Sequence, residues 1–184
     1  MQADWPDWIR TDINRMVSVD VEASGPNPAD YALLSIGACT LNSPREEFYV
    51  EIQPTTMNSE AQSQEIHQLD LEKLSQTGQP PEVAMRLFAD WIAESISSGI
   101  SPLFIGFNAP FDWMFVCDYF HRFMGINPFG HSALDIKSFL MGFKYLEWED
   151  TSMARLTTTV LRHNALEDAC DQADLFRRIV TGSE

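Results

Sequence analysis

The sequence lacks an apolar run long enough to cross a bilayer, and its first residues do not resemble a leader that would direct secretion. The longest nearly uncharged stretch, residues 100–111, contains Gly, Pro and Asn and falls short of the ~20 residues that a membrane-spanning helix needs. Residues 1–13 are polar and acidic, unlike a signal peptide. We therefore expect neither membrane insertion nor secretion.

Cysteine is scarce. Cys39, Cys117 and Cys170 lie far apart in the chain, and each is flanked by apolar residues. An odd number of dispersed cysteines does not make a disulfide framework, and it suits free, buried thiols in a reducing compartment. The pattern predicts a cytoplasmic protein.

Positive charge is also scarce, with 12 Lys and Arg against 27 Asp and Glu and a net charge of −15. This balance repels polyanions at long range, which argues against an extended groove that clamps the phosphates of a long duplex. If nucleic acid is the substrate, metal ions must offset the repulsion locally. The alternative interpretation of the acidic surface is solubility alone.

Fixed-period repeats, low-complexity tracts and Gly/Ser linkers are absent as well, so we expect a single domain over residues 1–184. Short apolar runs bounded by turn residues predict strands at residues 16–21, 31–41, 46–53, 103–107 and 133–134. The first three follow one another through short turns, which favours antiparallel pairing. Strands and helices then alternate, so the order predicts an α/β fold: a mixed central sheet, antiparallel first and then parallel, flanked by helices.

The helices are marked by proline, glycine and capping residues. Pro80-Pro81 opens one helix and Gly99 ends it. Its apolar stripe follows the 3.6-residue period and comprises Val83, Leu87, Phe88, Trp91, Ile92 and Ile96. A second helix runs from Pro110 to about residue 124, and a third begins after Asp135, its N-cap.

The final helix has the clearest start. Asn164 as N-cap and Glu167 three residues later resemble a capping box. The apolar stripe that follows comprises Leu166, Ala169, Cys170, Ala173, Phe176 and Val180. The sequence therefore predicts a long amphipathic helix near the C-terminus.

Four acids and a histidine lie at strand ends or helix starts. Asp20 and Glu22 are two residues apart in a strand, so the pleat directs both side chains to one face. Asp112 and Asp168 each fall in the first turn of a predicted helix, where the helix dipole favours an acid anyway. His163 precedes the last helix. Taken singly, each has an ordinary structural explanation; the constellation is a stronger signal than its parts.

This constellation resembles the DEDDh exonucleases, the family of polymerase proofreading subunits, ribonuclease T and oligoribonuclease. The motifs occur in the family's order: Asp20-Val21-Glu22 followed by Gly25, Asn108 to Phe111-Asp112, and the segment from His163 to Asp168. They span residues 16–180, almost the whole chain. The resemblance implies a ribonuclease H-like fold, which agrees with the mixed sheet expected from the element order.

The resemblance also implies roles for these residues. Two divalent ions, Mg or Mn, would be held by Asp20, Glu22, Asp112 and Asp168, because hard cations prefer oxygen ligands and offset the charge of a phosphodiester. His163 would be the general base. Substrate contacts fall to Ser24, Gly25, Asn108 and Phe111. Phe107 before the Asn, and Ser24 where Thr is frequent, depart from the commoner family forms and bear on substrate choice.

We therefore expect a metal-dependent 3'-5' exonuclease that releases nucleoside 5'-monophosphates from single-stranded or short RNA or DNA 3' ends. One alternative keeps the fold without catalysis, as a nuclease-like nucleic-acid-binding module. Another is a ribonuclease H-like endonuclease, which also uses clustered acids but which the His163 motif disfavours. The sequence leaves RNA or DNA, and monomer or homodimer, open.

Overall fold

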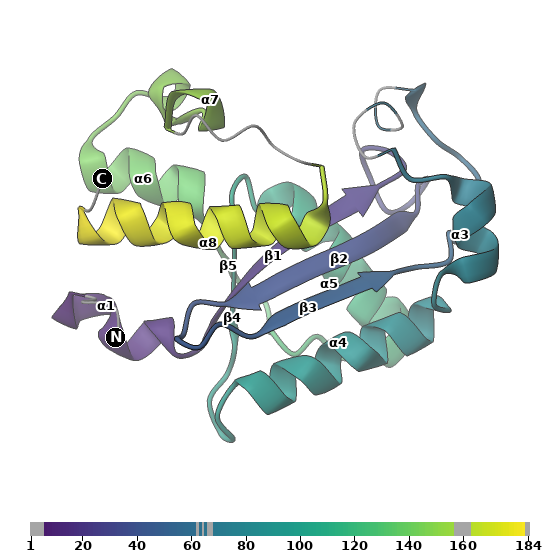
Figure 1. The fold of residues 1–184 in the computed structure, drawn as a ribbon, viewed down its shortest axis with the longest axis horizontal. Coiled ribbons are helices and arrows are strands. Elements are labelled where there is room, and N and C mark those ends of the chain that lie inside the picture. Colours follow the sequence, from purple (N-terminus) through teal and green to yellow (C-terminus); the bar gives the residue numbers. More distant parts are fainter. Residues whose placement is uncertain (1–5, 62, 64, 66–67, 157–162, 183–184) are drawn as a thin grey trace.

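A five-stranded sheet forms the centre of the computed structural model, which describes residues 6–61, 63, 65, 68–156 and 163–182 (Figure 1). The strands are β1 (Met16–Ala23), β2 (Leu33–Thr40), β3 (Glu47–Glu51), β4 (Leu103–Gly106) and β5 (Ala133–Asp135). Their order is β3-β2-β1-β4-β5. β1, β2 and β3 pair antiparallel, whereas β4 and β5 join parallel to β1. The predicted mixed α/β sheet is confirmed.

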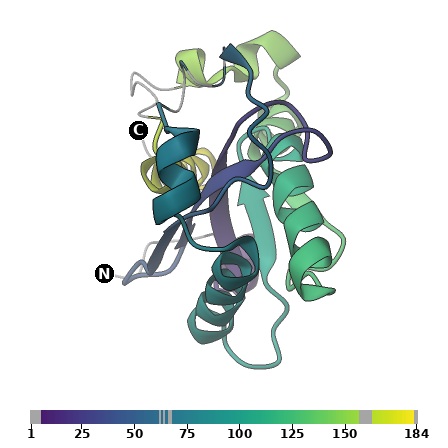
Figure 2. The ribbon, with the colours of Figure 1, turned by 90° about the vertical axis from the view of Figure 1, so that its right-hand side faces the viewer.

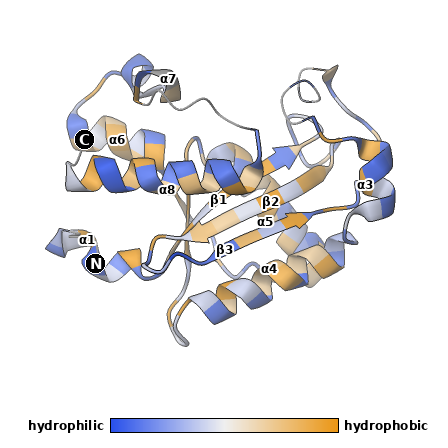
Figure 3. Ribbon diagram, in the orientation of Figure 1, coloured by the Kyte–Doolittle hydropathy of each residue, from blue (hydrophilic) through white to orange (hydrophobic). Residues whose placement is uncertain are grey.

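The two central strands are apolar because helices cover both of their faces. β2 is buried at every position, and β1 at every position except Asp20. Coloured by hydropathy, both strands are mainly apolar, whereas α8 alternates along its length (Figure 3). The polar side chains of Ser18 and Glu22 in β1 are thus buried, whereas Asp20 is partly exposed.

The described helices run as follows: α1 (Asp7–Ile13), α3 (Leu71–Thr77), α4 (Pro81–Ser95), α5 (Pro110–Met124), α6 (Ile136–Lys144), the 3-10 turn η1 (Trp148–Thr151), α7 (Met153–Leu156) and α8 (Ala165–Thr181). The predicted starts of α5, α6 and α8 are confirmed. Asp135 caps α6 by accepting from the Ser138 N–H at 2.7 Å. The sequence pattern did not predict α1, α3, η1 or α7.

The helices cover opposite faces of the sheet. α4 and α5 lie on one face and α8 on the other (Figure 2). Aromatic side chains such as Phe88, Phe104 and Phe120 fill the first layer. The second layer packs Phe176 and Ile179 of α8 against residues of α1 and α6. α8 therefore lies directly over β1 and β2.

The predicted extent of the helix after Pro80 is wrong. α4 ends at Ser95, and Ile96 turns to an extended backbone so that its side chain is buried. Gly99, with φ +83, lies in the loop beyond. Val83 and Leu87 of the predicted stripe are exposed, because the buried face is centred on Ala84, Met85, Phe88 and Ile92 instead.

Two expectations drawn from composition can be compared with the structure. The three cysteines are free, but only Cys39 is buried; Cys117 and Cys170 are part-exposed, which corrects the prediction of three buried thiols. Among the helices that the structure describes, none combines the length and apolarity needed to cross a membrane.

Candidate active site

Three carboxylates converge where β1 ends and α8 begins. Asp20 and Glu22 come from β1, and Asp168 from the first turn of α8. Their carboxylate oxygens lie within 4.8 Å of one another, and we call these three residues the acidic cluster. Glu22 and Asp168 are only 8% and 4% exposed. The structure therefore brings together, in a largely buried position, acids that are up to 148 residues apart in the sequence.

A glycine lets α8 approach the sheet closely enough to build this cluster. Gly37 of β2 pairs with Asp20, and a Cβ added there would lie 2.0 Å from the Ala165 carbonyl carbon. The Ser18 hydroxyl donates to the Ala169 carbonyl at 2.8 Å and ties the helix to β1. The sequence did not predict this close approach of α8 to β2.

The start of α8 is set by its predicted cap. The Asn164 side-chain oxygen accepts from the N–H groups of Leu166 and Glu167 at 3.1 and 3.2 Å. This fixes the first helical turn, in which Asp168 faces inward. Capping and the Gly37 approach together place the third carboxylate.

Asp112 lies beside the cluster rather than in it. It is 4% exposed in the first turn of α5, and its Oδ1 accepts from the Val21 N–H at 3.0 Å. The last paired residue of β1 against β4 is Ser18, so Asp112 takes a backbone N–H beyond the end of that ladder. The carboxylate retains its second oxygen for another partner.

Burial and mutual repulsion raise the pKa values of these acids. Desolvation, with Asp168 nearby, raises the pKa of Glu22 to about 7. Desolvation also raises the pKa of Asp112 to about 8, although the Val21 N–H opposes the rise. The pKa of Asp20 lies well above its usual range because of burial and the charges of Asp112, Glu22 and Asp168. At neutral pH these groups do not all ionise readily unless a cation is near.

The donor set fits a hard divalent cation. Mg²⁺ and Mn²⁺ prefer carboxylate oxygens, and the acidic cluster offers three of them within one ion's reach. Burial and the neighbouring carboxylates raise the pKa values of Asp20 and Glu22, and a divalent cation among these acids would offset both effects. Asp20, Glu22 and Asp168 are therefore the residues that would hold a metal ion.

A buried glutamine that sequence reasoning missed also reaches the cluster. Gln172 of α8 is 3% exposed, and its Nε2 donates to Asp20 Oδ1 at 2.5 Å. Its Oε1 accepts from the Phe107 N–H at 2.7 Å. The available signal was its spacing, since four residues after Asp168 is the same face of a helix.

His163 and Asn108 share an uncommon backbone conformation. Their φ angles are +54° and +61°, in the left-handed region, and both residues are exposed. Asn tolerates this region, but for His it is strained by about 1–3 kcal/mol. His163 directly precedes the cap of α8 and lies outside the acidic cluster. Two sharp turns thus present polar side chains near the starts of α5 and α8.

The remaining predicted substrate contacts differ in exposure. Ser24 is fully buried, and its Oγ accepts from the Ala32 N–H at 2.9 Å, so its hydroxyl holds the turn after β1. Gly25 lies against Tyr31, whose ring would be 2.2 Å from an added Cβ. Phe111 is part-buried, with its ring centroid 5.4 Å from that of Phe115. None of these three belongs to the acidic cluster.

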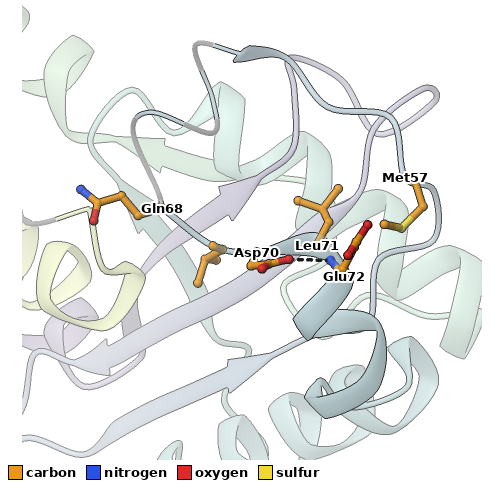
Figure 4. Close-up of a pocket in the computed structure, with 6 residues that line it drawn as sticks. Met57, Gln68, Asp70, Leu71 and Glu72 are labelled. Atoms are coloured by element: carbon orange, nitrogen blue, oxygen red, sulfur yellow. Dashed lines mark hydrogen bonds between the residues drawn. The ribbon is translucent and has the colours of Figure 1, made fainter.

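A pocket lies on the loop that precedes α3. It has a volume of about 510 Å³ and is lined by Met57, Gln68, Leu69, Asp70, Leu71 and Glu72 (Figure 4). This loop is tied to the end of β1, because the Glu60 N–H donates to the Ser24 carbonyl at 2.9 Å. Gln68 has a left-handed φ of +55°. Glu60 is thus hydrogen-bonded to the turn after β1, whereas none of the residues that line the pocket belongs to the acidic cluster.

Solved structures share this fold. The nuclease domain of 3'hExo, a DEDDh family member bound to rAMP, aligns with a TM-score of 0.76 at 10% identity over 100% of this chain and 96% of that one. A full-length 3'-exonuclease aligns with a TM-score of 0.71 at 12% identity. Escherichia coli Exonuclease I in complex with a dT13 oligonucleotide aligns at 0.69 and 14% identity. The alignments cover 91% and 89% of this chain but only 60% and 40% of those two proteins.

Two comparisons at the level of sequence identify the family. Residues 15–180 match the family model of the 3'-5' exoribonuclease Rv2179c-like domain. The Escherichia coli protein described as 3'-5' DNA exonuclease Cap18 is 42% identical over 181 residues, which is 96% of this chain and 97% of that protein. The matched region contains the acidic cluster, Asp112 and His163. The chain therefore belongs to the Rv2179c-like family of 3'-5' exonucleases.

Proposed function

We propose that this 3'-5' exonuclease is metal-dependent and hydrolyses phosphodiesters at the 3' end of single-stranded or short nucleic acid, releasing nucleoside 5'-monophosphates. The observation that carries the proposal is the acidic cluster of Asp20, Glu22 and Asp168, with carboxylate oxygens within 4.8 Å. Buried like charges at this spacing are stable when a cation lies among them.

Two divalent ions, Mg or Mn, are the cofactors in this proposal. Asp20, Glu22 and Asp168 would hold them directly, and Asp112 would contribute its carboxylate directly or through water. When bound, the ions would supply charge neutralisation at the phosphate oxygens and at the attacking and leaving oxygens. Because the protein carries a net charge of −15, this local neutralisation is what lets a phosphate approach.

His163 is the general base in this proposal and removes a proton from the attacking water. Its exposure is consistent with the role, because an exposed imidazole can exchange the proton with solvent. The left-handed backbone at His163 supports a functional placement, since strain of this kind concentrates at active sites. Its position just before the α8 cap keeps it near Asp168.

Substrate contacts fall to residues around the turns after β1 and β4. Gly25, Asn108 and Phe111 touch the terminal nucleotide in this proposal. Ser24 acts by holding the turn that carries Gly25, since its hydroxyl is buried against Ala32. The pocket on the neighbouring loop offers apolar side chains and the Gln68 amide, a combination suited to a base.

The relatives are named for different nucleic acids. The family model is that of an exoribonuclease domain, whereas the Escherichia coli relative is described as a DNA exonuclease. We propose that single-stranded or short ends of either polymer reach the site. The acidic surface disfavours a long duplex, which needs many phosphate contacts.

The test is product analysis on 5'-labelled RNA and DNA oligomers of graded length, with Mg²⁺ or Mn²⁺ and with chelator. We expect a ladder that shortens by one nucleotide at a time, release of 5'-monophosphates, and no reaction with chelator or in Asp20→Asn. Internal bands without a ladder would indicate a ribonuclease H-like endonuclease. Binding without any product would indicate a catalytically silent module.

The proposal treats residues 1–184 as one exonuclease domain that works in the cytoplasm. For a homodimer, the exposed aromatic side chains of Trp8 on α1 and Phe143 on α6 provide apolar surface. Their ring centroids are 5.8 Å apart, so they form one patch. Sedimentation velocity on the intact chain and on Trp8→Glu distinguishes monomer from dimer.

A further inference from the structure

Gln172 connects the three sequence motifs of the site through one side chain. It belongs to α8, one turn after Asp168 of the third motif. Its Nε2 contacts Asp20 of the first motif, and its Oε1 contacts the Phe107 N–H, which opens the turn of the second motif.

The orientation of the Gln172 amide follows from its partners. A backbone N–H can only donate, so Phe107 must meet the amide oxygen of Gln172. The amide nitrogen is thereby directed at Asp20, which accepts through Oδ1. Asp20 then has Oδ2 and the second lone pair of Oδ1 left for a cation. The amide thus restricts how the Asp20 carboxylate can rotate.

The turn of residues 107–109, which the Gln172 amide oxygen contacts, is fixed by a hydrogen bond at each end. Phe107 donates to Gln172, and the Ala109 N–H donates to Asp135 Oδ2 at 2.9 Å. Asn108, between them, has the left-handed backbone. This turn leads directly into α5 and Asp112. Movement of Gln172 would therefore reach both Asp20 and the segment that carries Asp112.

We propose that Gln172 is a positioning residue, which orients the Asp20 carboxylate for the divalent cation and couples it to the turn before Asp112. The proposal rests on the metal-dependent function proposed above. Groups that hydrogen-bond to a metal-binding side chain orient it, and losing them weakens metal affinity about 10- to 100-fold. Gln172 donates such a hydrogen bond to Asp20. Its side chain is buried, and both the nitrogen and the oxygen of its amide are hydrogen-bonded.

Mn²⁺ binding to the protein without nucleic acid tests this role. Gln172→Met keeps the length of the side chain but removes its donor and acceptor. We expect its Mn²⁺ dissociation constant, measured by isothermal titration calorimetry, to rise about 10- to 100-fold. Val180→Ala, at the far end of α8, is the control that loosens the helix without touching the site, and it should bind as the wild type does. A Gln172→Met constant within about twofold of wild type would overturn the proposal.

Asp20→Asn separates this proposal from the proposed function. Its Mn²⁺ affinity should fall at least as far as that of Gln172→Met. If Asp20→Asn bound Mn²⁺ like the wild type, Asp20 would not be a ligand, and the metal assignment would fail together with the role of Gln172. If Asp20→Asn bound weakly while Gln172→Met bound normally, only the role of Gln172 would be refuted.

A measurement on the unaltered chain remains decisive if Gln172→Met does not fold. The side-chain amide of Gln172 gives a ¹⁵N–¹H pair in the NMR spectrum, which can be assigned by its through-space contacts to Asp20 and Phe107. We expect this pair to shift and its proton exchange to slow when Mg²⁺ is added. An unchanged pair, in a spectrum where the Asp20 carboxyl carbon responds to Mg²⁺, would contradict the proposal.

Discussion

The two ends of α8 differ in what they bury. The N-terminal half places Asp168 and Gln172, 4% and 3% exposed, against β1. The C-terminal half places Phe176, Ile179 and Val180 against α1 and α6, with exposures of 0%, 7% and 6%. One helix thus carries a polar end that contains the candidate active site and an apolar end that contains part of the core.

The difference shows where stability and chemistry arise. Burial of a large apolar side chain stabilises a fold by about 1.5–3 kcal/mol. Burial of a carboxylate has the opposite effect unless a partner offsets it, and the raised pKa of Glu22 records that cost. The apolar end of α8 therefore stabilises the position of the helix, while the polar end provides carboxylates that can bind a cation.

The largest effect is expected at the polar end. Asp20→Asn should abolish almost all exonuclease turnover and reduce the melting-temperature gain produced by millimolar Mg²⁺ or Mn²⁺, because a ligand stabilises only the state that binds it. Val180→Ala at the apolar end should lower stability by about 0.5–3 kcal/mol and leave turnover unchanged. If Asp20→Asn kept wild-type turnover and an undiminished metal-dependent shift in melting temperature, Asp20 would not be a metal ligand.

A smaller loss of turnover is expected just outside the helix. His163→Ala should keep the fold and Mn²⁺ binding but lose about 10²- to 10⁴-fold in turnover, the usual contribution of a general base. Single-turnover kinetics at saturating metal, together with a Mn²⁺ titration, measure the two effects separately. Near-normal turnover in His163→Ala would assign the base to another group.

In the absence of metal, the buried acids at the polar end of α8 should make the stability of the protein depend on pH. An acid whose pKa is raised on folding binds more protons in the folded state, so stability falls as pH rises. The Glu22 pKa of about 7, against a usual 4.5, corresponds to about 3 kcal/mol of stability, which is fully present below about pH 4.5 and is lost as the pH rises through about 7. We expect chelated protein to melt lower at pH 8 than at pH 5.5.

Two comparisons isolate the cause of this pH effect. Glu22→Gln should flatten the dependence in chelator, and Mn²⁺ should stabilise the wild type more at pH 8 than at pH 5.5. Denaturant unfolding at the two pH values gives both numbers. A chelated protein more stable at pH 8 than at pH 5.5 would contradict the raised pKa.

Substitutions at two glycines test whether the close approach of α8 to the sheet is needed for stability and metal binding. Gly37→Ala places a Cβ about 2 Å from the backbone of Ala165, so the start of α8 must move. We expect Gly37→Ala to lower the free energy of unfolding by about 1–3 kcal/mol. It should also weaken Mn²⁺ binding. Gly142→Ala in α6 meets no atom within 4 Å and should be neutral or stabilising. Equal effects of the two substitutions would mean that the close approach does not matter.

The smallest expected effect concerns salt. Among the described basic residues near the site in sequence, Arg155 is paired with Asp150, and Lys137 and Lys144 lie 3.8 and 5.0 Å from the ring centroids of Trp148 and Phe143. Within the described part of the chain few cations are left to contact phosphates, so we expect a log–log salt slope near −2 for single-stranded binding. Titration of a fluorescent oligomer against Asp20→Asn measures it. A slope steeper than about −5 would reveal a basic groove.

The parts that the sequence predicted are those encoded by local pattern. The alternation in β1 correctly predicted that Asp20 and Glu22 share a face. Asn164 and Asp135 were identified as caps from their residue type and position, and both accept the expected backbone hydrogen bonds. The resemblance to the DEDDh exonucleases, rather than a local pattern, predicted that Asp168 joins these two acids. It also included Asp112, which lies beside the cluster.

The parts that the sequence missed depend on contacts between distant segments. Gln172 looks like any polar residue on a helix until Phe107 and Asp20 are placed beside it. Gly37 acts through the backbone of α8, which no local period reveals. Ser24 stays a predicted substrate contact because of its motif position; the burial of its hydroxyl and the hydrogen bond from the Ala32 N–H depend on tertiary packing and were not predicted.

The most direct test of the account is anomalous diffraction from crystals grown with Mn²⁺. We expect two peaks about 3.5–4 Å apart, as in two-metal nucleases, with ligands from Asp20, Glu22 and Asp168 and with Asp112 nearby. Both peaks should vanish or weaken strongly in Asp20→Asn. Strong Mn²⁺ peaks elsewhere on the protein, with none at the polar end of α8, would contradict the account.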